Sequence, residues 1–524
     1  PYNTGNKDFT YPDNFEYSNK EMKQIFDLDD DNLEKLKSIQ GNSSHSSWLS
    51  FMYPRLVLAK RLLSEDGCIL ISIDENEDFN LRIILNEIYG DNNFVGQVVR
   101  KTRSSTNDTS NGFNQQHESL YIYAKNIDKF RVTGEKKDFD MYSNPDNDPN
   151  GPWNNTNPSA RSGSEKTMFE IKNPYTGKVD TPPKGRYWAF SQKSMKKWID
   201  SGKFVFKKKH NPSERGFFIK KYVSELKSKN KQVDSLFAID NKFMNQSATR
   251  YLRDELFDGQ NLFTSPKPVE FIQKILKYTS KKDSVILDFF AGSATTAHAV
   301  MNLNFEDDGK RKFIMVQLPE RTYTVNSSGK KIPTIGGKNA FDFGYMTVDE
   351  LSMDRIKKSS KKIISNDNLF YKDFDGSFKH YTFIKPNDDL LNSINDFDIN
   401  NVILFNDVYN RFSADSLGVK GKASAKDTIL STWMMDDGFL FNSEVKNIKL
   451  GDYSANIINN ETIYLIDSGW NSECTKQLLN KIGNYEINVN TIVIFGYSFN
   501  IAEMKELEIG LKQLDMSINL LKRY

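Results

Sequence analysis

Cysteine is scarce in this sequence, since only Cys68 and Cys474 occur among 524 residues. Two cysteines cannot build a disulfide framework or a cysteine-ligated zinc site, and their scarcity is typical of a reducing cytoplasm, where we expect the protein to reside. No apolar run approaches the roughly 20 residues that a membrane span requires, so no membrane association is expected. No metal centre is expected either, because the histidines are too widely spaced to share a metal. They are His45, His117, His210, His298 and His380.

Charge of neither sign predominates, with 71 lysines and arginines against 69 aspartates and glutamates. Net charge therefore indicates no partner, and any nucleic-acid surface must come from local segregation of basic residues. Hydrophobic residues make up 38% and charged residues 27%, which is the balance of a globular protein. A chain of 524 residues is too long for one hydrophobic core, so we expect about two to four packed units.

Strand and helix patterns alternate in several stretches, which favours an α/β fold. Residues 68–74 form a continuous apolar run of strand length, which suits a strand buried on both faces of a parallel sheet. The other elements expected near the start are helices at 46–64 and 79–89 and strands at 94–100 and 118–124. After residue 267 we expect helices at 268–278, 295–302 and 349–364, and strands at 284–289 and 312–318. The last stretch predicts strands at 462–467 and 491–495 and helices at 472–482 and 502–514.

A tight turn of small residues follows the predicted strand at 284–289. The strand ends near Asp288, the turn contains Gly292, and a helix begins at Thr295. In an open parallel sheet such a turn lies at the carboxyl edge, where ligands bind, and glycine lets the backbone approach a ligand closely. The spacing is not Gly-x-Gly-x-x-Gly, and an acidic residue on the turn would repel a diphosphate. A cofactor with a cationic amino-acid end, such as S-adenosylmethionine, fits better.

A second carboxylate, Glu320, follows the next predicted strand. It can accept hydrogen bonds from both hydroxyls of a ribose, as the acidic residue of dinucleotide sites does. An ordinary strand–turn–helix corner with a surface glutamate would show either feature alone. Asp288 and Glu320 together favour a nucleoside cofactor.

Three stretches match one enzyme family in one order. Residues 1–5 (PYNTG) resemble the tail of the Asp-Pro-Pro-Tyr motif of amino-methyltransferases, and residues 264–272 (TSPKPVEFI) resemble the lysine–proline segment that precedes the cofactor turn. Residues 288–296 (DFFAGSATT) are similar to the family's Asp-x-Phe-x-Gly-Ser-Gly-Thr-Thr. This order, with the catalytic motif first, is that of the β class of DNA amino-methyltransferases. Further stretches resemble the modification subunits of type III restriction–modification systems in particular, and these are 72–77, 148–153, 173–177 and 182–188.

The resemblance implies a Rossmann-like α/β methyltransferase sheet with an inserted target-recognition domain and a C-terminal α/β domain. The implied division is a catalytic half at 1–100, a target-recognition insert at 101–262, a cofactor-binding half at 263–365, and a dimerisation or partner domain at 366–524. The cofactor implied is S-adenosylmethionine. The residues implied to bind it are Asp288, Phe289, Phe290, Gly292, Ser293, Thr295, Glu320 and Lys267.

The activity that the resemblance implies is methyl transfer to adenine N6 in duplex DNA, with the target base flipped out of the helix. The amino group would donate hydrogen bonds to an aspartate and to the following backbone carbonyl, which favours a tetrahedral nitrogen. The implied catalytic residues are Pro1, Tyr2 and Asn3, with Tyr2 stacking on the base. Both acceptors would precede Pro1, so the chain as numbered is expected to be inactive. Ala294 stands where the family usually has glycine, a change that is tolerated unless the turn needs a positive φ there.

Basic residues concentrate within the insert. Residues 203–231 hold ten lysines or arginines against Glu214 and Glu225, with five aromatic residues interleaved. This pattern suits phosphate contact, although a solvated basic hairpin would look the same. Because the family order places target recognition here, we expect DNA contact. The residues expected to make it are Lys101, Arg103, Lys207, Lys208, Lys209, Arg215, Lys220 and Lys221.

Several alternatives remain open. A stand-alone β-class adenine or cytosine-N4 methyltransferase would carry the same motifs, and a recognition subunit without catalysis would carry the same insert. A dinucleotide oxidoreductase is disfavoured by the turn spacing. As partners we expect duplex DNA, a second copy in a homodimer, and a restriction helicase–nuclease subunit. Asp74 is expected to cap the helix at 79–89 or to line the substrate cleft, and His298 to be a packing or capping residue.

Overall fold

The computed structural model separates into two compact units, residues 1–377 and 378–524, which are described one after the other. The residues that the structure describes are 2–5, 13, 15, 23, 29–40, 44–105, 113–365, 374–384, 409–514 and 517–524. Pro1 lies outside them.

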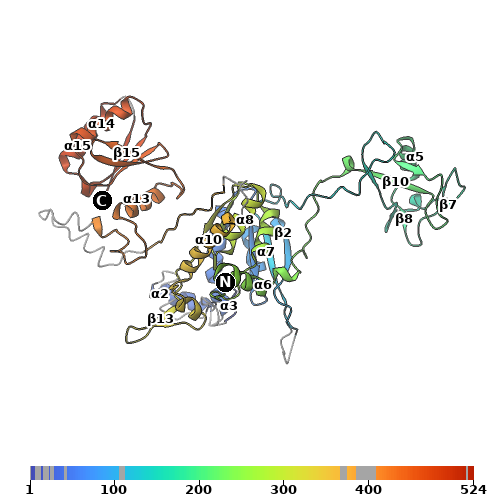
Figure 1. Ribbon diagram of the computed structural model, residues 1–524, viewed down its shortest axis with the longest axis horizontal. Coiled ribbons are helices and arrows are strands. Elements are labelled where there is room, and N and C mark those ends of the chain that lie inside the picture. The colour runs from blue at the N-terminus through green and yellow to red at the C-terminus, as the bar shows by residue number, and fades with distance from the viewer. Residues whose placement is uncertain are drawn as a thin grey trace. The chain divides into compact units, whose positions relative to one another are not determined.

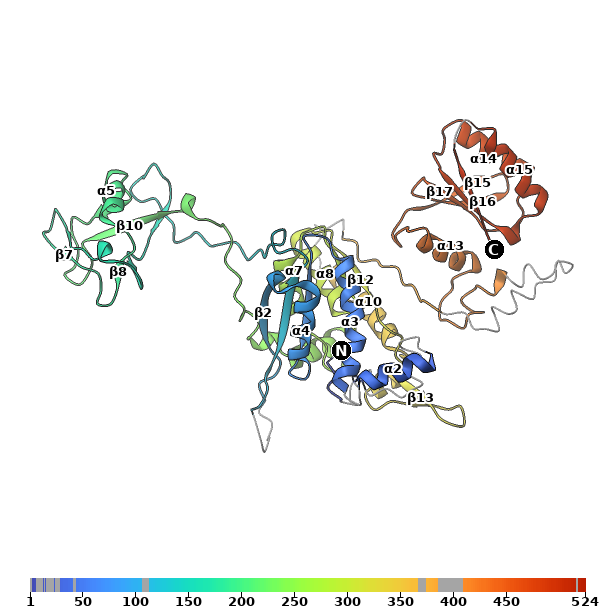
Figure 2. The same cartoon turned by 180° about the vertical axis from the view of Figure 1, so that it is seen from behind.

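The first unit begins with an antiparallel sheet. Its strands are β1 (Cys68–Ile73), β2 (Phe94–Lys101) and β3 (His117–Ala124), in the order β1-β3-β2. Helices α3 (Ser44–Leu62) and α4 (Asp78–Tyr89) lie side by side (Figure 2), and α2 (Asp30–Gln40) precedes them. The parallel environment expected for 68–74 is wrong, because β1 pairs antiparallel with β3 and most of its side chains are only partly buried.

Two hydrophobic clusters cover the two faces of β3. On one face Tyr121 and Tyr123 pack with Trp48 and Leu81 from α3 and α4. On the other face Leu120 and Ile122 pack with residues of α7 (Val269–Thr279), among them Phe271 and Ile275. Strand β3 is the centre of this sheet, and both of its faces are covered.

The cofactor half is a parallel strand pair covered by helices. Strands β11 (Val285–Asp288) and β12 (Lys312–Met315) pair in parallel, so that Asp288 is level with Met315. Helix α8 (Thr295–Asp307) connects them and packs between α7 and α10 (Val348–Ser365), as Figure 1 shows. A hairpin of β13 (Tyr323–Val325) and β14 (Lys331–Pro333) and the short helix α9 (Lys338–Asp342) follow β12.

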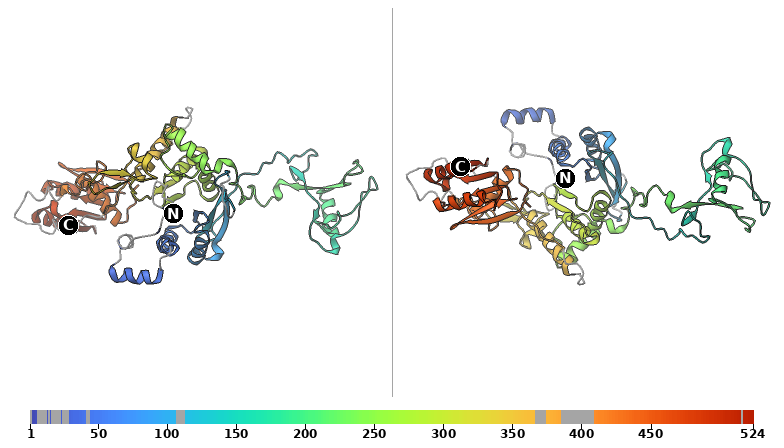
Figure 3. Two further views of the ribbon diagram at one scale, coloured as in Figure 1. Left: turned by 90° about the horizontal axis from the view of Figure 1, so that it is seen from below. Right: turned by 90° about the horizontal axis from the view of Figure 1, so that it is seen from above.

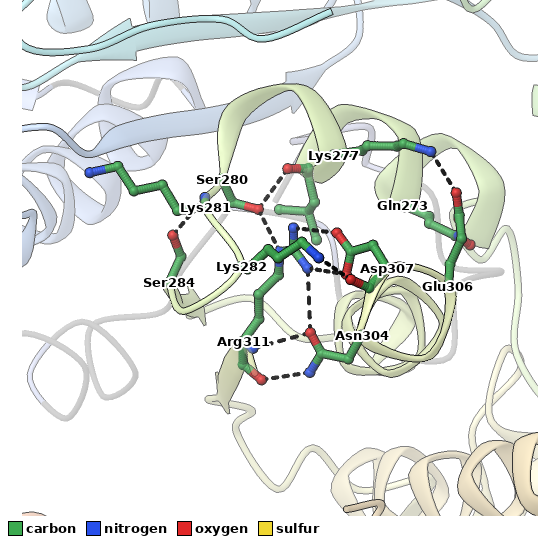
Figure 4. A network of polar contacts seen from close by, with 11 residues as sticks. Gln273, Lys277, Ser280, Lys281, Lys282, Ser284, Asn304, Glu306, Asp307 and Arg311 are labelled. Carbon is green, nitrogen blue, oxygen red and sulfur yellow. Dashed lines mark hydrogen bonds and ion pairs between the residues drawn. The ribbon is translucent and has the colours of Figure 1, made fainter. Parts of the chain in front are cut away.

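A buried arginine closes the amino end of this strand pair (Figure 4). Arg311 precedes β12 and donates two hydrogen bonds to Asp307 at the end of α8, with distances of 2.9 and 3.0 Å. Its Nε donates to Ser280 Oγ at 3.0 Å, and its carbonyl accepts from Asn304 at 2.8 Å. These contacts join the end of α7, the end of α8 and the start of β12. Side chains of the protein therefore fill the amino end of the strand pair, and a ligand site is expected at its carboxyl end.

The insert contains a lobe with its own core. Trp188, Phe190, Phe204 and Phe217 form that core. The lobe contains short elements, which are β4 (Trp153–Asn155), β5 (Ser159–Ala160), β6 (Ile171–Lys172), β7 (Val179–Asp180), β8 (Tyr187–Trp188), α5 (Gln192–Asp200), β9 (Phe204–Phe206) and β10 (Phe217–Tyr222). The chain then returns to the core of the first unit through α6 (Asn245–Tyr251) and a π-helical turn at Leu252–Leu256.

The second unit is a five-stranded sheet with helices on both faces (Figure 3). The strands run in the order β15 (Val445–Leu450), β16 (Tyr453–Ile458), β17 (Thr462–Leu465), β18 (Thr491–Phe495) and β19 (Asn519–Arg523), and the last three are mutually parallel. Alternate residues of β17 and β18 face opposite sides. Helices α14 (Ser472–Gly483) and α15 (Ile501–Lys512) pack against one side and α13 (Ala425–Asp436) against the other. Both strands and both of the predicted helices lie where the periodicity placed them.

Candidate active site and cofactor turn

A single cavity of about 2490 Å³ joins the two halves of the first unit. The edges of β1 and β11 both line it, and so do Tyr2 and Glu118 from the N-terminal half. Every residue predicted to bind the cofactor lies in its wall. These are Lys267, Asp288, Phe289, Phe290, Gly292, Ser293, Thr295 and Glu320. The structure thus brings the first and third motifs to one place, although about 280 residues of sequence separate them.

Asp288 shapes the glycine turn from within. Its two carboxylate oxygens accept hydrogen bonds from the backbone N–H of Phe290 at 3.1 Å and from Thr296 Oγ1 at 2.6 Å. Burial raises the pKa of this carboxyl group above its usual value. The side chain therefore joins the end of β11 to the start of α8, and a cation placed beside it would lower its pKa again.

Residues that the sequence analysis missed hold the other side of the turn. Gly292 has a φ of 52° and donates its N–H to Gln317 Oε1 at 2.7 Å, which links the turn to the end of β12. Arg355 of α10 is fully buried and donates to Ser293 Oγ and Thr295 Oγ1, each at 2.7 Å. Burial lowers the pKa of its guanidinium to about 10. The helix predicted at 349–364 as basic thus carries a cation that orders the turn from inside.

Glu320 lies where its predicted role requires an acceptor. Its side chain is half-buried in the cavity wall, and its carboxylate accepts no hydrogen bond from any described residue. Burial raises the pKa of this carboxyl group. A ligand with hydroxyl donors would supply the hydrogen bonds that the protein does not.

Asp13 fixes the loop that contains Tyr2 and Asn3. One of its carboxylate oxygens accepts from the backbone N–H groups of Tyr2 at 2.8 Å and Asn3 at 3.0 Å. The other accepts from the N–H and the hydroxyl of Thr4, at 3.1 and 2.8 Å. A carboxylate that accepts from successive N–H groups holds them in one geometry, so the loop is ordered by a side chain rather than by regular structure.

Glu77 anchors the same loop from a second direction. It is completely buried and accepts from Asn3 Nδ2 at 2.5 Å and from Asn80 Nδ2 at 2.7 Å. The ring of His45 also lies at hydrogen-bond distance from it, 2.7 Å. Asn3 has a φ of 58°, a conformation that asparagine adopts more readily than most residues. Glu77 also occupies the N-cap of α4, whereas Asp74, expected either to cap that helix or to line the cleft, accepts from Asn76 and lines the cavity.

A buried ion network positions the Tyr2 ring. The ammonium of Lys267 lies 4.6 Å from the ring centroid and donates to Glu118 at 3.1 Å. Glu118 also accepts from Arg100 Nε at 2.8 Å and from the Tyr2 hydroxyl at 3.4 Å. Arg100 is completely buried, and its remaining donors reach the carbonyl of Phe243 and the side chain of Asn245. Lys267, predicted to bind the cofactor, therefore contacts the predicted base-stacking residue.

Ala294 adopts a left-handed conformation, with a φ of 58°, so the turn does need a positive φ at this position. We expect Ala294→Gly to change the free energy of unfolding by less than about 1 kcal/mol. The substitution relieves the left-handed backbone strain of alanine, which stabilises the folded state by roughly 1–2 kcal/mol. It also removes a buried methyl group, which destabilises the folded state by about 0.8 kcal/mol. Glycine loses more conformational entropy on folding, which costs about a further 0.5–1 kcal/mol. Urea unfolding measures the sum. Ala294→Val should destabilise clearly, and a Gly variant that is equally unstable would contradict the compensation.

The predicted DNA-binding residues have different surroundings. Lys208, Lys209 and Lys221 are exposed, and Arg103 lies at the rim of the large cavity. Lys101 donates to Asn241, and Lys207 pairs with Glu214 at 3.1 Å.

Lys220 does not fit the prediction of a DNA contact. Its side chain is only 4% exposed, and Asp146 and Asp148 both pair with it. The two carboxylates neutralise the ammonium group inside the lobe, where a DNA phosphate cannot reach it. We therefore remove Lys220 from the set of DNA-binding residues. His298, predicted to be a packing or capping residue, lies buried on α8 with its ring 5.7 Å from that of Tyr251.

In the described part of the chain, no group of three or more histidine, cysteine, aspartate or glutamate side chains is arranged to hold a metal ion. None of the helices described combines the length and apolar character needed to cross a membrane.

Comparison with known proteins places the chain in a family. The DNA methylase family model matches residues 1–325, and a model of the type III restriction–modification EcoP15I C-terminal domain matches residues 424–520. The StyLTI Mod subunit, a type III restriction–modification enzyme of Salmonella typhimurium, is 38% identical over 545 residues, which cover 100% of this chain and 79% of the relative. The EcoPI Mod subunit of Escherichia phage P1 is 30% identical over 98% of this chain and 78% of its own.

A solved structure, the PvuII DNA methyltransferase (cytosine-N4-specific), aligns with 62% of this chain and 80% of its own at 9% identity. Its TM-score of 0.26 is too low to carry an argument. The two family models and the identity to Mod subunits along almost the whole chain agree with the motifs gathered around the cavity. The chain belongs to the DNA methylase family and, within it, to the Mod subunits of type III restriction–modification systems, which makes it a DNA methyltransferase.

Proposed function

We propose that the protein transfers a methyl group from S-adenosylmethionine to adenine N6 in duplex DNA. The observation that carries the proposal is the single cavity lined by both Tyr2 and the turn from Asp288 to Thr295. A base and a nucleoside cofactor must meet for such a transfer, and this cavity is large enough to hold both.

The cofactor fits the residues present. Glu320 offers a half-buried carboxylate without a partner among the described residues, which suits a ribose diol. Gly292 leaves the turn backbone accessible, and Asp288 places negative charge beside it. When bound, the cofactor supplies an electrophilic methyl group on a sulfonium.

The N-terminal loop handles the base. Tyr2 provides an aromatic face against which a flipped adenine stacks. Lys267 and Glu118 hold that ring from behind, and Asp13 fixes its backbone. This preorganisation reduces the reorganisation that the base would otherwise require on entering the site.

The exposed lysines of the insert lobe provide contacts to the DNA backbone in this proposal, and the second unit provides contacts to partner chains. Lys208, Lys209 and Lys221 are the exposed candidates for phosphate contact. The match of residues 424–520 to a C-terminal domain of type III enzymes supports a role of the second unit in binding a second copy or a restriction subunit. Light scattering of the whole protein, alone and mixed with that subunit, tests this role.

The deciding experiment measures transfer of labelled methyl from S-adenosylmethionine to mixed-sequence duplex DNA by the protein expressed from its complete reading frame. We expect the label in N6-methyladenine. Label in N4-methylcytosine would replace adenine by cytosine as the target. Cofactor binding without any transfer would favour a recognition subunit, and loss of cofactor binding as well would overturn the role given to Asp288 and Glu320.

A further inference from the structure

An open concavity of about 470 Å³ lies on the insert lobe, apart from the large cavity. It is formed where β4 ends and where β5 pairs with β8. Of these strands, β8 is labelled in Figures 1 and 2. Its polar lining comes from asparagine, arginine, serine and threonine, and no acidic residue takes part. The side chains on which the argument rests are Asn155, Asn157, Arg186 and Arg215.

Both arginines contact other residues of the lobe and still have N–H groups without a partner among the described residues. The lobe contains three arginines, Arg161, Arg186 and Arg215, and two of them line this concavity. Arg186 donates one hydrogen bond to the Ser159 carbonyl at 3.0 Å, while its Nε has no partner among the described residues. The Arg215 guanidinium lies 5.9 Å from the ring centroid of Trp188, a core residue of the lobe. Neither arginine forms an ion pair with a described residue, and of the five donors that each guanidinium carries Arg186 uses one for Ser159.

The asparagines add a second type of recognition group. Asn155 is exposed at the end of β4, and Asn157 is exposed two residues further on. The Asn157 side-chain oxygen accepts from the N–H and hydroxyl of Ser159, both at 3.1 Å, which orients its amide. Arginine donates two hydrogen bonds to the major-groove edge of guanine, and asparagine makes a donor–acceptor pair with adenine. The concavity therefore combines the side chains that distinguish purine bases.

Phosphate binding is the competing interpretation, and the charges of the lobe argue against it. The exposed Lys208, Lys209 and Lys221 already supply cations for the backbone. A phosphate also carries only acceptors, so the amide oxygen of Asn155 would have no use beside it. Base edges present donors as well as acceptors, which makes use of both kinds of group.

We propose that this concavity reads the base sequence of the DNA substrate, with Arg186 and Arg215 contacting guanine, Asn155 pairing with adenine, and the amide NH2 of Asn157 donating to an acceptor on a base edge. The inference rests on the proposed function only in taking duplex DNA as the substrate. What it adds is the identity of the side chains on the insert lobe that distinguish one base from another.

The test is selection of bound duplexes from a randomised library, followed by sequencing, with the full-length protein. This measures base preference without requiring methyl transfer, so its outcome is independent of the methylation assay. The variants are Arg186→Lys and Arg215→Lys, which keep the charge but lose the bidentate fork. We expect each to reduce the preference for one base of the selected sequence about 10-fold or more, with binding to non-specific DNA unchanged.

Two controls separate base reading from other effects. Arg161→Lys changes the lobe arginine that does not line the concavity, and it should leave the selected sequence unchanged. Lys208→Gln with Lys209→Gln should weaken binding to all sequences and lower the salt dependence by about two phosphate contacts.

Three results would overturn the inference. They are an unchanged selected sequence in both arginine variants, a uniform loss with a reduced salt slope, and a wild-type protein without base preference. Should either arginine variant unfold, Asn155→Ala provides the same test from an exposed position.

Discussion

Replacing Glu118 by glutamine is expected to lower the free energy of unfolding of the first unit by about 3–5 kcal/mol, the usual effect of breaking a buried ion pair. Glu118 lies between Arg100, which is completely buried, and Lys267, which is partly buried in the cavity wall. Without the carboxylate, the buried guanidinium loses its ion pair and faces a second cation. Urea unfolding gives the loss of stability, and hydrogen exchange across residues 94–124 shows whether β2 and β3 open.

The wild-type protein should also show a pH dependence that the variant lacks. Burial acts to raise the pKa of Glu118, but Lys267 and Arg100 outweigh it and lower the pKa to about 2 from an ordinary 4.5. Because the folded-state pKa is depressed, the stabilisation is complete above pH 4.5 and is lost as the pH falls toward 2. Between pH 4.5 and pH 2 the Glu118→Gln variant should lose less stability than the wild type does, because only its other carboxyl groups titrate there. Glu65→Gln, which removes an exposed partner of Lys129, serves as the matched control and should change little. Equal stability and equal pH profiles in wild type and Glu118→Gln would contradict the role of the network.

The second large effect is expected on cofactor affinity. Glu320→Gln should weaken binding of S-adenosylhomocysteine, the product form of the proposed cofactor, by about 10- to 100-fold, because hydrogen bonds to a charged acceptor contribute roughly 1.5–3 kcal/mol. Calorimetric titration measures this directly. Burial raises the pKa of Glu320, so the affinity of the wild type should decrease as the pH is lowered through that raised pKa. The variant should lack this contribution to the pH dependence.

The control for this experiment is Glu306→Gln on α8, whose carboxylate pairs with Lys277 and does not line the cavity. It should bind the ligand as the wild type does. If Glu320→Gln retains full affinity and the wild-type pH response, the ribose is held elsewhere. The cavity assignment would then rest on Asp288 and the glycine turn alone.

Elements with a strong local pattern were predictable from the sequence. The strand before Asp288 and the helix after Thr295 occur as expected, although β12 ends at Met315 rather than 318. Most residues of α8 between Thr295 and Leu303 are buried. Strand β18 has the predicted bounds at both ends. Periodicity and turn residues determine such elements within a window of about ten residues, so one sequence suffices.

The pairing of β1 was not predictable in the same way. Its run of apolar residues fits a parallel or an antiparallel neighbour equally well, and the choice depends on β3, about 50 residues later in the chain. The short strands of the insert lobe were missed for a related reason. Two-residue strands such as β5 and β8 carry no periodicity, and their pairing is set by the packing of Trp188.

The supporting residues of the site left no local signal. Asp13, Glu77 and Arg355 are ordinary charged residues in sequence, and their partners in the site, Thr4, Asn3 and Ser293 among them, lie 9 to 74 residues away. Lys220 shows the converse case. It belongs to a basic run that indicates a surface, but Asp146 and Asp148 draw it into the lobe from 72 and more residues away.

The contacts of Arg100 also constrain the order in which the parts of the chain can fold during synthesis. Its guanidinium reaches the carbonyl of Phe243, which the ribosome adds 143 residues later. At roughly 5–20 residues per second, about 7–30 s pass before that acceptor exists. A guanidinium cannot be buried without its partners, so β2 must stay hydrated during this interval. The insert lobe, whose core is complete by Ile219, is free to fold first. The newborn chain would therefore complete its insert lobe before its methyltransferase core.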